Sequence, residues 1–364
     1  MNPKKFKISI LDGYIIKKFL GTFFFSMLLI IVIVIIFDIS EKIDDFLEKK
    51  VSATEIIFDY YLNFIPYFVT LFSSLFIFIA VIFFTSKLAY NSEIIAILSS
   101  GVSFRRFLYP YFISACILAL FMTFLNEIVM PSANKKRLVF EDAYIKSPVT
   151  YNRQNVHKQV EPGLFVYLES FRSEQASRFS MERYEGQRLV SKLMSDRAIW
   201  DKEKEKWTIL NYFVRDIDSL GNETLLSGES IDTTINLHPD EFKRRDNFIE
   251  QMNMTELNNF INELKMQGAD NINQYIIKMH ERIAGPFSTF ILTLIGVSLS
   301  TRKVRGGIGI HVAIGITLCF LYILFMRFSS EFATKGNLSP ILAAWIPNII
   351  FGVVGIFLYR LAPK

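Results

Sequence analysis

The segment 91–103 (NSEIIAILSSGVS) has residue types and spacing that point to a function. Its first residues can cap a helix, Glu93 would lie in the first turn where the helix dipole favours a carboxylate, and Gly101 can end the helix. Apolar residues at i, i+3 and i+4 share one face of this helix: Ile94, Ile97 and Leu98. The segment therefore predicts a short helix that either rests on lipid or docks into a groove of a protein partner.

Outside this segment, the sequence has no spacing typical of catalysis or metal binding. Its four histidines and two cysteines share no metal-ligand spacing, and the HExxH and GxSxG motifs are absent. The glycine-rich segment 302–311 (RKVRGGIGIH) lacks the Lys-Ser/Thr ending of an ATP-binding P-loop, so we interpret it as a basic turn. We therefore expect no catalytic residue, no metal and no cofactor in this chain.

The elements that must position the 91–103 segment are apolar runs. Apolar residues make up 51% of the 364 residues, and Phe alone contributes 36. Crossing a bilayer takes about 20 apolar residues, whereas a soluble helix of that length needs a charged stripe. Runs of this kind without Asp, Glu, Lys or Arg are Phe19–Phe37, Tyr60–Ser86, Phe107–Asn126, Ile283–Thr301, Gly306–Met326 and Gly336–Tyr359. The sequence therefore predicts a polytopic α-helical membrane protein with six transmembrane helices, three on each side of a polar middle segment.

The distribution of Lys and Arg predicts the orientation of these spans. Segments on the side of the two termini carry thirteen basic residues, and the two loops on the opposite side carry five. Because cytoplasmic loops are enriched in Lys and Arg, we expect both termini in the cytoplasm and the middle segment outside it. The formal net charge of +5 is then a topology signal, and nucleic acid is not an expected partner.

The middle segment changes to the pattern of short strands. Leu164–Phe171, Arg178–Tyr184, Arg188–Ser195 and Trp207–Arg215 are rich in β-branched, aromatic and alternating apolar residues. The polar stretch Asp201–Lys206 suits a hairpin turn. We expect an all-β domain, as a sandwich, a jelly roll or a curved open sheet, followed by a helix that begins near Thr255 and stops at Gly268.

The sequence resembles the lipopolysaccharide-export permeases of the LptF/LptG (YjgP/YjgQ) family. The matching motifs follow one another from the first span to the last. They are Leu11-Asp12-x-Tyr14, Glu93-Ile-Ile-Ala96-x-Leu98-x-x-Gly101-Val102-Ser103, Met130-Pro131-x-Ala133-Asn134, His280-Glu-Arg282-x-Ala284-x-Pro286, Arg305-Gly306-Gly307-x-Gly309 and Ala344-Trp345-Ile346-Pro347-Asn348. The segments Val304–Gly309 and Met326–Ser329 favour the LptG-type branch of the family.

The resemblance implies a fold in which an all-β, β-jellyroll-like periplasmic domain is inserted between the third and fourth spans. The expected divisions are residues 1–134 for spans one to three with a cytoplasmic coupling helix at about 91–101, 135–250 for the β domain, 251–282 for a helical connector and 283–364 for spans four to six. The protein would lie in the cell inner membrane.

The resemblance also implies partners. Such permeases pair as LptF with LptG over a dimer of the ATPase LptB, so hydrolysis belongs to a separate cytosolic protein. A single-span partner, LptC, joins the pair, which extracts lipopolysaccharide from membrane lipids and passes it to a periplasmic bridge. On this reading the ATPase-coupling residues are Glu93, Ile94, Ala96, Ile97, Leu98, Gly101, Ser103 and Arg105.

The lipid substrate would need cations near the outer rim for its phosphates. The head-group candidates are Lys42, Lys49, Lys50, Lys135, Lys136, Arg137 and Arg327. Some family members place a lysine near the outer end of span one, where this chain has Asp38. Two alternatives stay open: a permease for another lipid or lipoprotein, and a membrane anchor that displays a β domain for envelope assembly without transport. Photocrosslinking of lipid and a pull-down of an ATPase would distinguish them.

Overall fold

The computed structural model places the chain in two compact units, which we describe separately. The helical unit comprises Met1–Ile145, Glu250–Met254 and Asn273–Lys364, and the sheet unit comprises Lys146–Ile249 and Thr255–Ile272. The structure describes residues 9–145, 153–172, 174–239, 246–266, 272–302, 308–336 and 338–362. Gly268 and residues 303–307, which carry part of the basic turn and of one family motif, lie outside the described residues.

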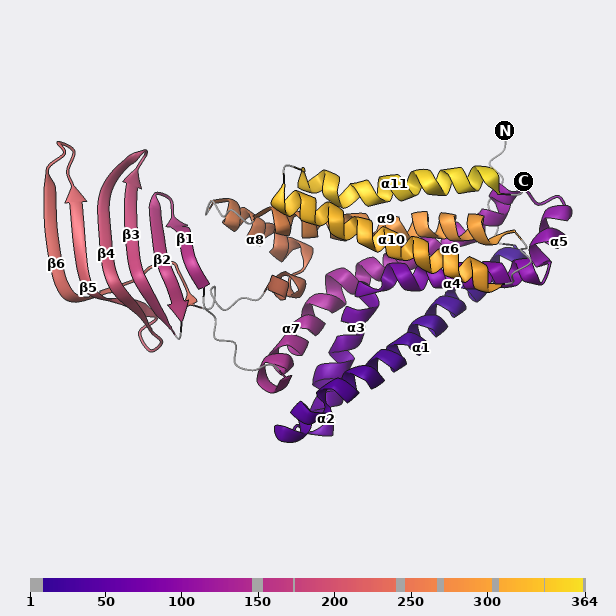
Figure 1. Cartoon of the computed structure of the whole chain (residues 1–364), viewed down its shortest axis with the longest axis horizontal. Helices are drawn as coiled ribbons and strands as arrows, with labels where there is room; N and C mark the ends of the chain where they lie inside the picture. The colour runs from indigo at the N-terminus through magenta and orange to yellow at the C-terminus, as the bar shows by residue number, and fades with distance from the viewer. Residues whose placement is uncertain are drawn as a thin grey trace. The chain divides into compact units, whose positions relative to one another are not determined.

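Among its described residues, the helical unit contains six helices that are long and apolar enough to cross a membrane. They are α1 (Ile10–Glu48), α4 (Ser73–Tyr90), a continuous helix over Phe104–Ile145, α9 (Ile272–Ser300), α10 (Ile308–Lys335) and α11 (Pro340–Leu361). The fold class expected from the apolar runs is confirmed, because these helices flank a sheet domain inserted between the third and the fourth. Figure 1 shows the six helices and the short helix α5 (Glu93–Ser99) between α4 and α6.

The helical segments at the second and third spans are less regular than the sequence indicates, and the third is longer. The second is preceded by α2 (Ala53–Glu55), the π-helical turn η1 (Ile56–Tyr61) and α3 (Leu62–Leu71), which holds Pro66. The third consists of α6 (Phe104–Phe124), η2 (Leu125–Val129), α7 (Met130–Phe140) and η3 (Glu141–Ile145). The helix therefore runs past residue 134, where the expected β domain begins, and the first described strand begins at Arg153.

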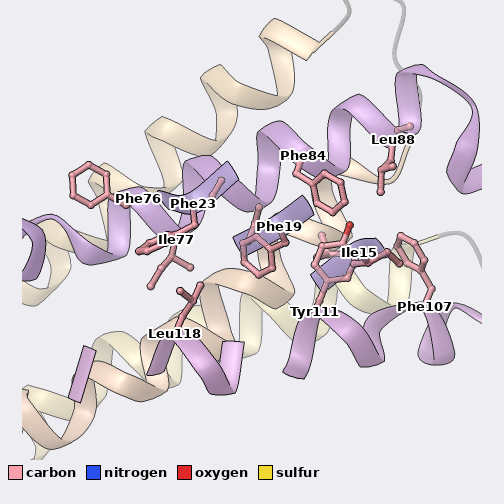
Figure 2. Close-up of a cluster of buried hydrophobic side chains, with 14 of the residues drawn as sticks. Ile15, Phe19, Phe23, Phe76, Ile77, Phe84, Leu88, Phe107, Tyr111 and Leu118 are labelled. Carbon is pink, nitrogen blue, oxygen red and sulfur yellow. The ribbon is translucent and has the colours of Figure 1, made fainter. Parts of the chain in front are cut away.

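Helix α4 packs at the centre of the helical unit. Its residues Phe76 and Phe84 meet Phe19 and Phe23 of α1 and Tyr111 of α6 in the largest buried apolar cluster among the described residues (Figure 2). Gly296 of α9 faces Val81 of α4, and a Cβ at that glycine would lie 2.6 Å from the valine Cγ1. Small residues at such points let helix backbones approach closely inside a membrane.

The described strands of the sheet unit form a six-stranded antiparallel meander. The strands are β1 (Arg153–Glu161), β2 (Leu164–Arg172), β3 (Gln175–Glu185), β4 (Arg188–Asp201), β5 (Lys206–Ile217) and β6 (Glu223–Thr233), and each pairs with the next. The four predicted strands correspond to β2 through β5, and the predicted turn lies between Asp201 and Lys206. Figure 1 shows that the sheet curves.

One face of the sheet carries the core of this unit. Trp207 is fully buried, and its indole Nε1 donates a hydrogen bond to the Leu237 carbonyl at 2.8 Å. Leu168 and Phe179 pack in the same cluster. A 3₁₀ turn, η5 (Asp246–Gln251), precedes helix α8 (Met254–Met266), whose buried residues are Leu257 and Ile261.

Candidate functional site

Helix α5 spans seven residues in the loop between α4 and α6. The chain enters it through Ser92, whose φ of 62° is left-handed and whose side chain makes no capping hydrogen bond. It leaves through Gly101, whose φ of 88° suits glycine, after the Gly101 amide bonds the Leu98 carbonyl at 3.1 Å. A sharp turn at each end thus sets α5 apart from the neighbouring spans.

The apolar face of α5 packs against the helical unit itself. Ile94 is 1% exposed and lies in the cluster of α4 and α6, with Ile97 and Leu98 partly buried against the same cluster. Ile95, by contrast, is 53% exposed, and Ala96 is exposed beside it. The chain's own core therefore covers Ile94 and part of Ile97 and Leu98, and a contact of this face with a partner stays a prediction.

The Glu93 carboxylate is held by two side chains of the same chain. The Tyr14 hydroxyl of α1 donates to Oε2 at 3.0 Å, and the Asn91 amide donates to Oε1 at 3.1 Å. Both hydrogen bonds are exposed, so the carboxylate is oriented at the surface and still open to a cation from outside.

A second contact joins α1 to the segment just after α5. The Arg106 guanidinium of α6 donates to both carboxylate oxygens of Asp12, each at 2.6 Å. Asp12 is buried and also accepts from the Ser9 amide at 2.8 Å as part of a capping box that begins α1. Ser103 caps α6 through the Arg106 amide at 3.4 Å, while Arg105 is exposed.

The sequence singles out Asp12 and Tyr14 only as parts of a family motif, and it treats Arg106 as a topology charge. The local capping box of Ser9 and Asp12 carries a sequence signal, a serine followed three residues later by an acid. No local signal exists for the pairing with Arg106, which lies 94 residues away.

Two of the seven head-group candidates are engaged inside the helical unit. The Lys42 ammonium pairs with Asp38 and the Tyr60 hydroxyl, and it lies 4.9 Å from the centroid of the Tyr60 ring. Tyr61 donates to the other Asp38 oxygen at 3.1 Å. Asp38 thus neutralises Lys42, which lies four residues later.

Arg137 is the second engaged candidate. Its guanidinium donates to Glu141 at 2.9 Å and to the Asn134 side-chain oxygen at 3.1 Å, and its Cζ lies 4.0 Å from the centroid of the Tyr67 ring. Arg137 and Glu141 are both buried. The remaining candidates are all exposed: Lys49, Lys50, Lys135, Lys136 and Arg327.

A short segment, Glu250–Met254, returns the chain to the helical unit, and we name it the strap. Three side chains bind its backbone: Asn134 donates to the Glu250 carbonyl at 3.2 Å, Glu127 accepts from the Met254 amide at 2.9 Å and Arg282 donates to the Met252 carbonyl at 2.7 Å. Burial raises the pKa of the Glu250 carboxyl above its ordinary value, and the nearby cations oppose that shift. The strap is therefore fixed to the third span on one side and to α9 on the other.

Comparison with known proteins accounts for nearly the whole chain. Residues 13–361 match the family model for the lipopolysaccharide export system permease LptF/LptG. The chain is 21% identical over 276 residues to the lipopolysaccharide export system permease protein LptG of Escherichia coli strain K12, which covers 74% of this chain and 76% of that protein. The protein of the same name from Escherichia coli O6:H1 strain CFT073 gives the same identity and coverage.

Proposed function

The chain belongs to the LptF/LptG family, and from that premise we propose that it is a permease subunit of an ATP-driven lipopolysaccharide exporter in the inner membrane. The observation that carries the proposal is α5, which is anchored by Ile94 and presents Glu93 and Ile95 at the surface. The similarity to proteins named LptG favours the LptG-type subunit, with a paralogous LptF as its partner.

In this proposal α5 receives the motion of a separate ATPase, a dimer of LptB. Glu93 meets a basic residue of the ATPase, and Ile95 and Ala96 add apolar contact at the centre of the interface. Ser103 and Arg105 lie at its rim. Ile94, Ile97 and Leu98 transmit the motion to the helical unit, and Gly101 provides the turn that lets α5 protrude.

The degree of burial supports a lipid path along α1 and α10. Only 17% of the apolar stretch of α1 and 22% of that of α10 is buried inside the chain, against 61% for α4 and 56% for α9. The two poorly buried helices therefore offer apolar surface to acyl chains or to the paralogous subunit. At the outer rim, the exposed Arg327, Lys49, Lys50, Lys135 and Lys136 are the cations proposed to meet lipid phosphates.

The sheet unit is proposed to lie in the periplasm and to pass lipid towards a bridge that includes LptC. The excess of Lys and Arg on the side of the termini supports this orientation.

Replacing Glu93 by lysine tests the ATPase-coupling part of the proposal. In Glu93→Lys, a like charge would face the basic residue of the ATPase, so we expect loss of co-purification or of lipid-stimulated hydrolysis. Glu41→Lys is the matched control, because it makes the same charge change at an exposed position near the C-terminal end of α1. Normal assembly and full lipid-coupled hydrolysis in Glu93→Lys would overturn the assignment.

The identity of the lipid is tested by capture. A photoreactive residue at Leu29, an exposed position of α1, is expected to crosslink lipopolysaccharide during ATP turnover. Capture of another lipid or a lipoprotein instead would retain the exporter and change its substrate.

A further inference from the structure

We propose that Asp12 and Arg106 form a clamp that makes the first turns of α1 move together with α5 during ATP-driven transport. The proposal rests on the function proposed above, because it assigns positioning residues to the coupling step. Neither residue touches the lipid or the ATPase in this proposal; they act through α5 and α1.

Two contacts, of which the clamp is one, join α1 to the two sides of α5. On the N-terminal side, Tyr14 bonds Glu93, the first residue of α5. On the C-terminal side, Arg106 in the first turn of α6 bonds Asp12. Because Asp12 and Tyr14 are two residues apart, one short stretch of α1 carries both contacts. Motion of α5 must then displace that stretch or break the contacts.

The two contacts differ in strength, and the difference assigns their roles. Arg106 and Asp12 form two parallel charge-assisted hydrogen bonds, which is the geometrically most specific pairing of an arginine with a carboxylate. Asp12 is fully buried, so losing Arg106 would leave a buried carboxylate without its counter-ion. The Arg106 Cζ also lies 5.2 Å from the centroid of the Tyr109 ring, which limits its rotation. This contact is the rigid one.

The contact between Tyr14 and Glu93 is the exchangeable one. It is a single hydrogen bond at the surface, where water competes with the tyrosine. A cation of the ATPase can therefore take over Glu93 without leaving a buried polar group unpaired. Docking then replaces the weak contact while the clamp keeps α1 attached.

The consequence for transport lies in α1 itself. The helix runs without a break over 39 residues, a length of about 58 Å at 1.5 Å per residue. A displacement of its first turn is therefore carried along the helix with the least buried apolar stretch among the described spans. The clamp would thus deliver the motion of the ATPase to a helix whose surface is open to lipid.

The first experiment measures lipid release per ATP hydrolysed in the full complex reconstituted in liposomes. In Arg106→Gln and Asp12→Asn we expect hydrolysis to continue and the release per ATP to fall about tenfold, within the usual range of a coupling free energy. Arg106→Lys keeps the charge but loses the second hydrogen bond, so an intermediate ratio is expected. The charge swap of Asp12→Arg with Arg106→Asp is expected to restore part of the ratio.

The control breaks an ion pair of the same unit away from α5. Lys335→Gln removes an exposed partner of Glu331, with which it pairs at 3.0 Å, and should leave the ratio unchanged. An unchanged ratio in Arg106→Gln and Asp12→Asn would overturn the proposal. So would a parallel fall of hydrolysis and release in every variant, because that is the signature of damaged folding rather than of lost coupling.

A second measurement keeps the proposal testable if these variants do not assemble. In a background with Cys116→Ala and Cys319→Ala, spin labels at Lys18→Cys of α1 and Ser99→Cys of α5 occupy exposed positions. Their separation should stay constant between nucleotide states, while the separation of Lys18→Cys from a label at Arg360→Cys of α11 changes. A change between α1 and α5 would overturn the clamp.

The outcome also separates this inference from the function on which it rests. If Glu93→Lys uncouples the complex while the clamp variants behave as wild type, only the clamp fails. If Glu93→Lys itself is without effect, the proposed function fails first.

Discussion

The helical unit is held by polar contacts at α5 and at the strap, and the two sets are built differently. Around α5, side chains bind side chains, and Tyr14 and Arg106 are each more than a third exposed. At the strap, Asn134, Glu127 and Arg282 bind backbone groups; Asn134 is buried and the other two are half-buried. Exposed side-chain contacts can be exchanged for those of a partner, whereas a buried backbone group left unpaired is costly. The comparison therefore assigns adjustment to the contact of Tyr14 with Glu93, and fixed attachment to the strap and to the pairing of Arg106 with the buried Asp12.

The largest expected effect is the loss of Arg137, which supports the strap. Arg137→Ala removes the ion pair with the buried Glu141 and a hydrogen bond to Asn134, the residue that binds the Glu250 carbonyl. We expect a loss of about 3–5 kcal/mol of stability, measured as a lower thermal unfolding midpoint in detergent. The neighbouring exposed Lys136→Ala should change stability by less than about 0.5 kcal/mol. Equal losses of stability in Arg137→Ala and Lys136→Ala would show that Arg137 supports the strap no more than an exposed lysine does.

The buried arginine also shows where sequence reasoning stops. Residues 135–137 (KKR) have the appearance of an exposed basic run, and the sequence offers all three as lipid contacts. Helical spacing carried a contrary signal, because Arg137 lies four residues before Glu141 and three after Asn134. Lys42 lies four residues after Asp38 in the same way.

Whether the sequence could predict the other parts of the fold depended on physical properties of each part. The six spans were predictable because a bilayer requires long runs free of charge. Strand β6 was not, since it is an almost fully exposed edge strand without alternation of apolar residues. For α5, periodicity identified the apolar face but could not say what covers it, and the structure shows that the chain's own core does.

A second prediction concerns the pH dependence of the strap. Burial raises the pKa of Glu250, so the folded chain holds that proton at a higher pH than the unfolded chain does. The stability associated with the protonated group is complete below the unfolded pKa, and it falls as the pH rises towards the folded pKa. We therefore expect Glu250→Gln to remove part of the decline in the free energy of unfolding above about pH 4.3, the ordinary pKa of Glu.

The measurement is denaturant unfolding of both forms at several pH values. Glu256→Gln, on α8, is the control for a general loss of one carboxylate. Identical pH slopes for wild type and Glu250→Gln would show that the strap carboxyl is as well solvated as the contacts around α5. That result would contradict the fixed attachment of the strap.

The smallest expected effect is at Tyr14, whose hydrogen bond with Glu93 we take to be exchangeable. Tyr14→Phe removes only the hydroxyl that bonds Glu93. If docking of the ATPase exchanges this bond, its removal spares the complex a net cost of about 0.5–1.5 kcal/mol, and affinity for the ATPase should rise a few-fold. A titration of the labelled ATPase into the purified permease pair measures it, with Tyr109→Phe as a control that leaves Glu93 untouched. A lower affinity would mean that Tyr14 orients Glu93 for docking. The contact would then be as fixed as those of the strap, and the adjustable element would have to be sought elsewhere along α5.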